Sequence, residues 1–108
     1  MTGEVPAPLS PIVFHILLAL SEAPGHGYAI MRAVDESARG SLSIGPGMIY
    51  GSLQRMERDS LVHERSDAGD RRRTFELTRD GRRALVDESA RLARLADLAR
   101  GKGLVRAE

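Results

Sequence analysis

Residues 41–77 read SLSIGPGMIYGSLQRMERDSLVHERSDAGDRRRTFEL, and this stretch decides the fold that the whole sequence predicts. Ile49, Leu53 and Met56 recur at the spacing of one helical face, which predicts an amphipathic helix over residues 46–59. Two short strand-like runs follow at 61–65 and 74–77, separated by an Asp/Gly turn. The stretch therefore predicts a helix followed directly by a β-hairpin.

Opposite its apolar face, this predicted helix carries a polar and cationic surface. The surface comprises Gly47, Gly51, Gln54, Arg55 and Arg58, with Met48 and Ser52 at its margin. A glycine inside a helix costs about 0.5–1 kcal/mol relative to alanine, so a solvated face has no local reason to carry Gly51. A surface that must approach a nucleic acid groove closely has such a reason. In that groove, Gln and Arg can donate hydrogen bonds to base edges. The alternative is an ordinary solvated helix face.

The hairpin concentrates positive charge near its tip. Its basic residues Arg65, Arg71, Arg72 and Arg73 are opposed there only by Asp67 and Asp70. Consecutive arginines repel one another unless phosphates or carboxylates neutralise them, so we expect Arg71, Arg72 and Arg73 to bind phosphate; a solvated turn is the alternative. A donor-rich helix followed by a basic hairpin is the order of a winged helix-turn-helix, whose wing contacts the DNA backbone.

Size and composition narrow the class of protein. At 108 residues the chain predicts one domain, and oligomerisation would enlarge its modest core. Sixteen basic residues against fifteen acidic ones give a net charge of +1, so nucleic acid binding must rest on local charge. The absence of cysteine fits a reducing cytoplasm. Lys102 is the only lysine; arginine suits phosphate and guanine, although a GC-rich genome would give the same bias.

Two helices are predicted before the central stretch. The composition of residues 1–8 predicts a loose arm, and Ser10 with Pro11 predicts a helix start for a segment that runs to about residue 22. Its apolar residues cover most of its circumference, which implies a second buried face such as a subunit contact, and the run is too short to cross a membrane. Residues 23–27 form a turn, and a second helix spans 28–39 and ends at Gly40. In the following turn, Leu42 and Ile44 predict a small strand or a buried plug.

The last predicted helix spans residues 79–100, with Thr78 as its N-cap, before a frayed tail at 101–108. Leucines near heptad spacing predict an apolar stripe, while charged residues keep the rest solvated. The helix is longer than a compact three-helix core requires, so packing on a second subunit is favoured over folding back. The expected dimer interface comprises Ile12, Phe14, Leu18, Leu85, Leu92, Leu95 and Leu98.

The sequence offers little that would favour an enzyme. His15, His26 and His63 are spread over a helix, a turn and a strand without carboxylates at metal-ligand spacing, so we expect structural roles for them. Neither a nucleophile motif nor a glycine-rich phosphate loop accompanies the serines, histidines and aspartates. We therefore expect no catalytic residue, no metal and no cofactor.

The residues resemble the PadR-like transcriptional regulators, specifically short members with a single C-terminal helix, over residues 9 to about 100. Four segments carry the resemblance: His26, Gly27 and Tyr28; Pro46, Gly47 and Tyr50 with Leu53, Arg55, Met56 and Glu57; Leu61 and Val62; and Leu77, Thr78, Gly81 and Arg82. The chain has Gly51 where the family often has proline, and Ser60 where glycine is common.

The resemblance implies a dimeric DNA-binding protein, usually a repressor, whose first and last helices build the dimer. It places residues near the start of the third helix on the operator, here Ser43, Gly47, Met48 and Tyr50. Tyr50 lies beside the buried arc of the helical wheel, so it could be a core aromatic, a phosphate ligand, or both.

Taken together, the sequence predicts a mainly α-helical fold with a small β-hairpin. A winged helix-turn-helix domain over residues 9–78 precedes a C-terminal dimerisation helix. The expected function is that of a cytoplasmic homodimeric repressor that binds double-stranded DNA at a pseudo-palindromic operator, with room for a small-molecule effector. The alternatives are a winged-helix module that binds protein, or a small-molecule sensor that does not read the operator directly.

Overall fold

The computed structural model describes residues 7–65, 69 and 72–106 of the chain. Helix α1 spans Pro11–Ala19, and the Ser10 side chain accepts a hydrogen bond from the Val13 amide, which confirms the predicted start. The predicted end near Glu22 is wrong. The helix ends at Ala19, where the turn tightens: the Ser21 amide bonds to the Leu18 carbonyl three residues back rather than four. Leu20 is buried at this end.

Helices α2 and α3 follow the predicted order closely. Helix α2 spans Gly27–Ala38, and the chain then reverses through Arg39 and Gly40, which have φ values of 51° and 81°. Residues 41–45 form no strand; Ile44 is half-buried against the core, as a plug. Helix α3 spans Pro46–Arg58, and the left-handed turn after it falls on Ser60, with φ 60°.

A small antiparallel sheet includes the predicted hairpin. Strand β2 spans Val62–Arg65 and strand β3 spans Thr74–Leu77, with Val62 opposite Leu77 and Glu64 opposite Phe75. The order is β1-β3-β2, and β1, Gly25–His26, was expected to be part of a turn. This strand could not be predicted because its partner, β3, lies 48 residues away along the chain.

Helix α4 spans Arg79–Gly101, and the Thr78 hydroxyl accepts a hydrogen bond from the Gly81 amide at 2.9 Å, as the predicted N-cap requires. Gly81 also allows a close approach between segments. A Cβ at this position would overlap the carbonyl oxygen of Leu61, so the start of α4 lies directly against the turn between α3 and β2.

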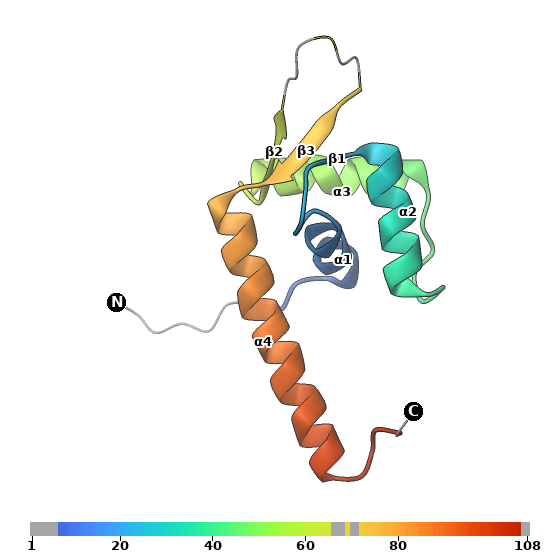
Figure 1. Cartoon of the computed structure of the whole chain (residues 1–108), viewed down its shortest axis with the longest axis vertical. Coiled ribbons are helices and arrows are strands. Elements are labelled where there is room, and N and C mark those ends of the chain that lie inside the picture. Colours follow the sequence, from blue (N-terminus) through green and yellow to red (C-terminus); the bar gives the residue numbers. More distant parts are fainter. Residues whose placement is uncertain (1–6, 66–68, 70–71, 107–108) are drawn as a thin grey trace.

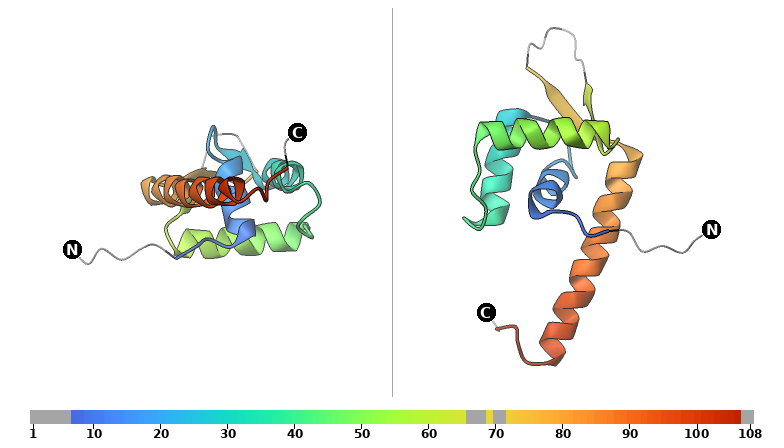
Figure 2. Two further views of the ribbon diagram at one scale, coloured as in Figure 1. Left: turned by 90° about the horizontal axis from the view of Figure 1, so that it is seen from below. Right: turned by 180° about the vertical axis from the view of Figure 1, so that it is seen from behind.

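Helix α1 lies at the centre of the core, between α2 and α4 and against α3 (Figure 1). The buried apolar residues come from every helix and from the hairpin: Ile16, Leu17, Leu20, Ile30, Val34, Ile49, Leu53, Met56, Val62, Phe75 and Leu85. The C-terminal half of α4 extends clear of the other elements, and the chain measures 53 × 40 × 22 Å (Figures 1 and 2). Among the described residues, none of the helices combines the length and apolar character needed to cross a membrane.

Candidate nucleic-acid interface

Helix α3 lies at one surface of the molecule, and the views from below and from behind show its outer side uncovered by other elements (Figure 2). Ile49, Leu53 and Met56 are fully buried on its inner side, as predicted. The outer side exposes the predicted polar residues Gln54, Arg55 and Arg58. The structure therefore brings the cationic part of α3 together on a surface that a partner can reach.

Ser52 differs from its expected place at the margin of this surface. Its side chain is buried, and its hydroxyl accepts a hydrogen bond from Nη2 of Arg55 at 3.2 Å. The contact holds the Arg55 side chain along the helix, beside Gly51. Ser52 is therefore a residue that positions Arg55, rather than one that a partner could contact.

Tyr50 points from α3 toward the start of α2. Its hydroxyl occupies the space that a side chain at Gly27 would need, and a Cβ there would overlap it. Tyr50 nevertheless stays 40% exposed, so one edge of the ring packs within the chain while the other faces solvent. Both predicted roles, packing and partner contact, remain compatible with this position.

Arg73, which lies in the wing just before β3, is held by ion pairs. Arg73 donates a hydrogen bond to Glu64 at 3.0 Å, lies 3.9 Å from Glu57, and stacks over the Phe75 ring at 5.1 Å. The bond to Glu64 is the largest cause that raises the pKa of Arg73, with desolvation acting against it. Carboxylates of this chain thus already neutralise Arg73, one of the three arginines expected to bind phosphate.

The other wing residues differ in how far the structure describes them. Arg65 lies 3.6 Å from Glu76, which also contacts the His63 ring at 2.7 Å. Arg72 is exposed. Arg71, like Asp67 and Asp70 in the predicted charge balance of the tip, lies outside the described residues.

The three histidines have polar neighbours within the chain. His15 Nδ1 lies 2.7 Å from the Ser37 hydroxyl, and His26 Nδ1 lies 3.0 Å from the Thr74 hydroxyl, which joins the start of α2 to the wing. Across the residues that the structure describes, His, Asp and Glu side chains form no group of three or more that could hold a metal ion.

The residues predicted for the dimer interface divide into three groups. Leu18, Leu92, Leu95 and Leu98 are exposed in the single chain. Ile12 and Phe14 are half-buried against the core. Leu85 is only 6% exposed and packs inside the chain's own core, so little of its side chain is left for a subunit contact. The same stripe continues past the core because α4 is longer than the elements it packs against.

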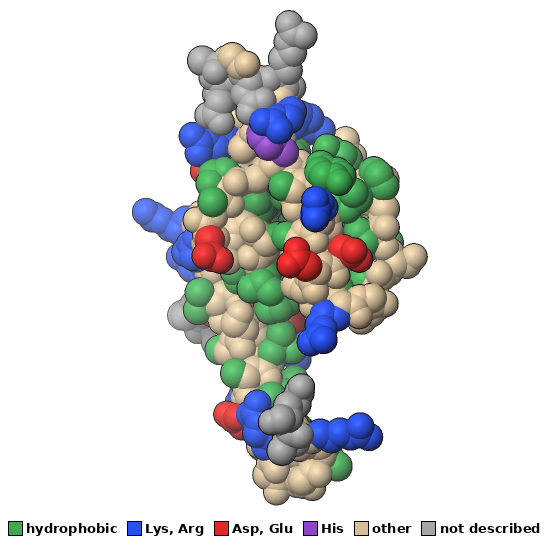
Figure 3. Space-filling view, turned by 45° about the vertical axis from the view of Figure 1, so that its right-hand side comes forward, with side chains coloured by type: hydrophobic (Ala, Val, Ile, Leu, Met, Phe, Trp, Pro, Cys, Tyr) green, Lys and Arg blue, Asp and Glu red, His purple; other side chains and the backbone are tan. Residues whose placement is uncertain are grey.

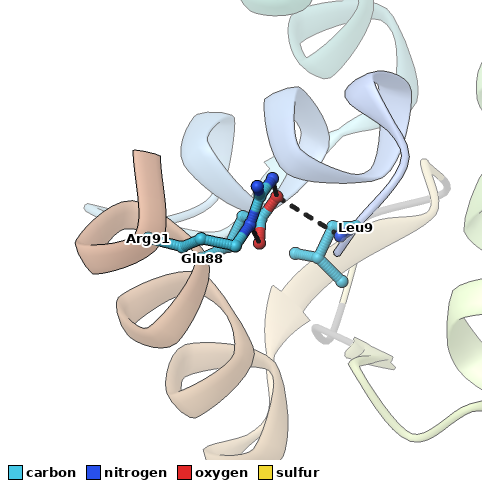
Figure 4. Close-up of polar contacts among 3 residues, drawn as sticks. All are labelled: Leu9, Glu88 and Arg91. Carbon is cyan, nitrogen blue, oxygen red and sulfur yellow. Dashed lines mark hydrogen bonds and ion pairs between the residues drawn. The ribbon is translucent and has the colours of Figure 1, made fainter. Parts of the chain in front are cut away.

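Glu88 holds the N-terminal segment to α4, which sequence reasoning missed. Its carboxylate, 6% exposed, accepts two hydrogen bonds from Arg91, at 2.9 and 2.6 Å, and one from the Leu9 amide at 3.3 Å (Figure 4). Arg91 lowers the pKa of Glu88, and the same contact raises the pKa of Arg91. The spacing of the two residues on a helix could have predicted the ion pair, but nothing local points to Leu9.

Comparison with known proteins identifies the family. The transcriptional regulator PadR-like family matches residues 16–87, about two thirds of the chain. The chain belongs to this family. The predicted resemblance is confirmed, and PadR-like proteins are transcriptional regulators, so the expectation that the chain is not an enzyme is confirmed as well.

Two curated relatives share the PadR-like region. An uncharacterized 37.1 kDa protein in transposon TN4556 of Streptomyces fradiae is 42% identical over 81 residues, which cover 75% of this chain and 23% of the relative. The transcriptional regulator YqjI of Escherichia coli is 32% identical over 66 residues, covering 61% of this chain and 31% of YqjI. The match thus spans only 23% and 31% of the length of these two relatives.

Solved PadR structures share the fold. A PadR family transcription regulator from Clostridium difficile superposes with a TM-score of 0.73 at 23% identity, covering 85% of this chain and 97% of that one. Bacillus subtilis PadR in complex with operator DNA gives a TM-score of 0.63 at 22% identity, covering 74% and 47%. The predicted winged helix-turn-helix fold with a long C-terminal helix is therefore confirmed.

Proposed function

We propose that this PadR-like protein is a sequence-specific DNA-binding repressor that acts as a homodimer on a pseudo-palindromic operator. The observation that carries the proposal is the uncovered outer side of α3, where Gln54, Arg55 and Arg58 are exposed together. Helix α3 would enter the major groove, where Gln and Arg side chains donate to base edges. The B. subtilis member was crystallised with operator DNA, which supports the same role here.

Phosphate contacts would surround this reading helix. We propose that Arg58 and Tyr50 hold phosphates beside the groove, with Ser43, Gly47 and Gly51 close enough for their backbone to approach the DNA. The wing would add Arg71 and Arg72, and Arg73 once it leaves Glu64. Since these contacts fix the protein on the duplex without reading sequence, specificity would rest on α3.

A second subunit would cover the exposed leucines. Leu92, Leu95 and Leu98 lie on the part of α4 that extends past the core, and Leu18 is exposed on α1. Apolar side chains that gather on an extended helix favour association. Two α3 helices in successive major grooves would be about 34–36 Å apart. Because the protein is proposed to bind operator DNA, the proposal includes a cytoplasmic location.

A small-molecule effector is a further part of the proposal. A hollow of about 330 Å³ lies between the N-terminal segment and α4, lined by Ala7, Leu9, Ala84, Asp87, Glu88, Ala90, Arg91 and Arg94. Its volume lies at the lower end of the range of ligand pockets. DNA binding by BpsR of Bordetella bronchiseptica, which shares the fold at 20% identity and a TM-score of 0.67, is regulated by 6-hydroxynicotinic acid.

The test is binding to the DNA upstream of the protein's own gene, measured by fluorescence anisotropy against scrambled DNA of equal length at several salt concentrations. We expect preference for the upstream DNA and a steep loss of affinity with salt, because phosphate contacts release counterions. Equal weak binding to both DNAs, or none, would favour a protein-binding winged-helix module instead.

A pair of variants makes this test specific to α3. We expect Arg58→Ala to weaken binding to all DNA sequences about equally and to reduce the salt slope by about one unit, as the loss of one phosphate contact should. Lys102→Ala removes the same charge at the far end of α4 and should change binding little. If both variants bind equally well, the outer side of α3 is not the DNA-binding surface.

A further inference from the structure

The first half of α3 differs from the second half in the chemistry that it exposes. From Pro46 to Gly51, all of which the structure describes, only Met48 and Tyr50 present large exposed side chains. The Tyr50 hydroxyl, the one side-chain donor of this half, lies against Gly27 of α2. The first half of the helix therefore offers a partner an almost wholly apolar surface.

Apart from the Tyr50 hydroxyl, the side-chain hydrogen-bond donors of α3 lie in its second half. Gln54, Arg55 and Arg58 are exposed there, and Ser52 holds one guanidinium nitrogen of Arg55. Met48 precedes Arg55 by seven residues, which is two helical turns, so the two side chains lie on the same flank of α3. A base pair that meets Met48 would thus lie along the same groove as one that meets Arg55.

Met48 is 46% exposed, and further large apolar side chains are exposed near the starts of α2 and α3. Tyr28, at the start of α2, is 65% exposed. A hollow of about 140 Å³ lies between the starts of the two helices, lined by Gly27, Tyr28, Met31, Pro46, Ile49 and Tyr50. Hydrophobic side chains also gather below the wing on the side toward α2, with basic side chains beside them (Figure 3).

The major groove presents one apolar group to such a surface, the 5-methyl group of thymine. The first residues of a reading helix are those that contact base edges. Resting on the operator binding proposed above, we propose that Met48 reads thymine methyl groups in the operator. Gln54 and Arg55 then read the neighbouring bases by hydrogen bonds, so the operator has thymines at the positions where α3 begins.

The test replaces thymine by deoxyuridine in the DNA that the wild-type protein prefers over scrambled DNA. This exchange removes the methyl group and keeps every hydrogen-bonding group and phosphate. We expect the deoxyuridine duplex to bind about fourfold more weakly for each methyl group contacted, because each lost methyl group removes the hydrophobic gain of burying about one CH2 group. We expect Met48→Ala to bind the two duplexes equally, and Met48→Leu to keep the preference.

Controls separate this inference from the proposed function. Gln54→Ala should bind both duplexes more weakly and keep their ratio, because it removes a donor and leaves Met48 in place. If the wild-type protein rejects scrambled DNA yet binds the thymine and deoxyuridine duplexes equally, it does not read methyl groups. Operator binding would still stand. A preference that persists in Met48→Ala would overturn it too, because the uridine effect would then come from DNA shape. Failure to prefer the upstream DNA at all would overturn both.

Discussion

Gly81 lies at the start of α4, where the carbonyl oxygen of Leu61 leaves no room for a side chain. A methyl group there would overlap backbone atoms, which cannot rotate away as a flexible side chain can. We expect Gly81→Ala to lower the free energy of unfolding by about 1–3 kcal/mol, the usual cost of overpacking. Urea unfolding followed by circular dichroism would measure the change.

Gly51→Ala is the matched control for this prediction, because it makes the same exchange in a helix interior with free space. The nearest neighbouring atom to a Cβ there, Nη1 of Arg55, is 3.8 Å away. We expect the variant to gain about 0.5–1 kcal/mol in stability. It should also bind operator DNA more weakly if the helix approaches the groove closely at Gly51. Equal stability changes in the two variants would contradict the close contact at Leu61.

Glu88 gives the stability a pH dependence. Arg91, and to a smaller extent the Leu9 amide, lower its pKa below the ordinary value of 4.5, although desolvation opposes them. Because the folded pKa is the lower one, the carboxylate stabilises the fold above pH 4.5, and this contribution is lost as the pH falls through the folded pKa. We therefore expect Glu88→Gln to be less stable than the wild type at neutral pH, with the difference shrinking in acid.

Thermal unfolding of both proteins between neutral pH and about pH 3 would test this prediction. Glu36→Gln, at an exposed position of α2, serves as the charge control and should run parallel to the wild type. A stability difference between Glu88→Gln and the wild type that stays constant over the whole range would show that the carboxylate acts only through packing.

At the scale of the elements, the wing combines the phosphate contacts proposed for it with carboxylates of its own. Glu64 on β2 holds Arg73, which lies just before β3. We expect Glu64→Gln to release the guanidinium for phosphate, which tightens operator binding and steepens the salt slope by about one unit. Fluorescence anisotropy over a salt series would measure both quantities.

Removing any negative charge from the protein strengthens its attraction to DNA, so a second variant controls for the change in net charge. Glu36→Gln removes one carboxylate from α2 and should change the salt slope little. Combining Glu64→Gln with Arg73→Gln should abolish the gain. If the gain survives in the double variant, Arg73 is not the group that Glu64 withholds from DNA.

At the scale of the whole molecule, α4 leaves leucines exposed beyond the core. Leu95 lies at the middle of this exposed stripe. We expect Leu95→Arg to shift the protein from a dimer to a monomer of 11.8 kDa in sedimentation, because a charge would be buried in the subunit contact. The melting temperature of the monomeric domain should change little, since Leu95 is 40% exposed and is not part of the buried core cluster.

Val86→Arg is the control on the same helix. Val86 is exposed, but nine residues before Leu95 it points to the opposite side of α4 at 3.6 residues per turn. Its substitution should leave the dimer intact. A wild-type protein that sediments as a monomer at all concentrations would contradict the subunit contact itself.

Local signals in the sequence determined most of the elements. The Ser10–Pro11 start of α1, the Thr78 cap of α4, the apolar spacing of α3 and the two strands of the hairpin all depend on residues within a few positions of one another. Capping and side-chain periodicity act over one or two turns, so they can be recognised in the sequence without knowledge of the fold. The same spacing also separated the polar side of α3 from its buried side.

Only the tertiary structure decided contacts between distant segments. The sequence places Leu85 and Leu95 on one stripe, yet Leu85 is buried in the core and Leu95 is exposed. The reason is that α4 extends beyond α1, the helix that it packs against. Likewise, Arg73 meets Glu64 only when β2 and β3 pair, and Glu88 meets Leu9 only when α4 crosses the N-terminal segment. Such contacts follow from the path of the whole chain, which no local pattern encodes.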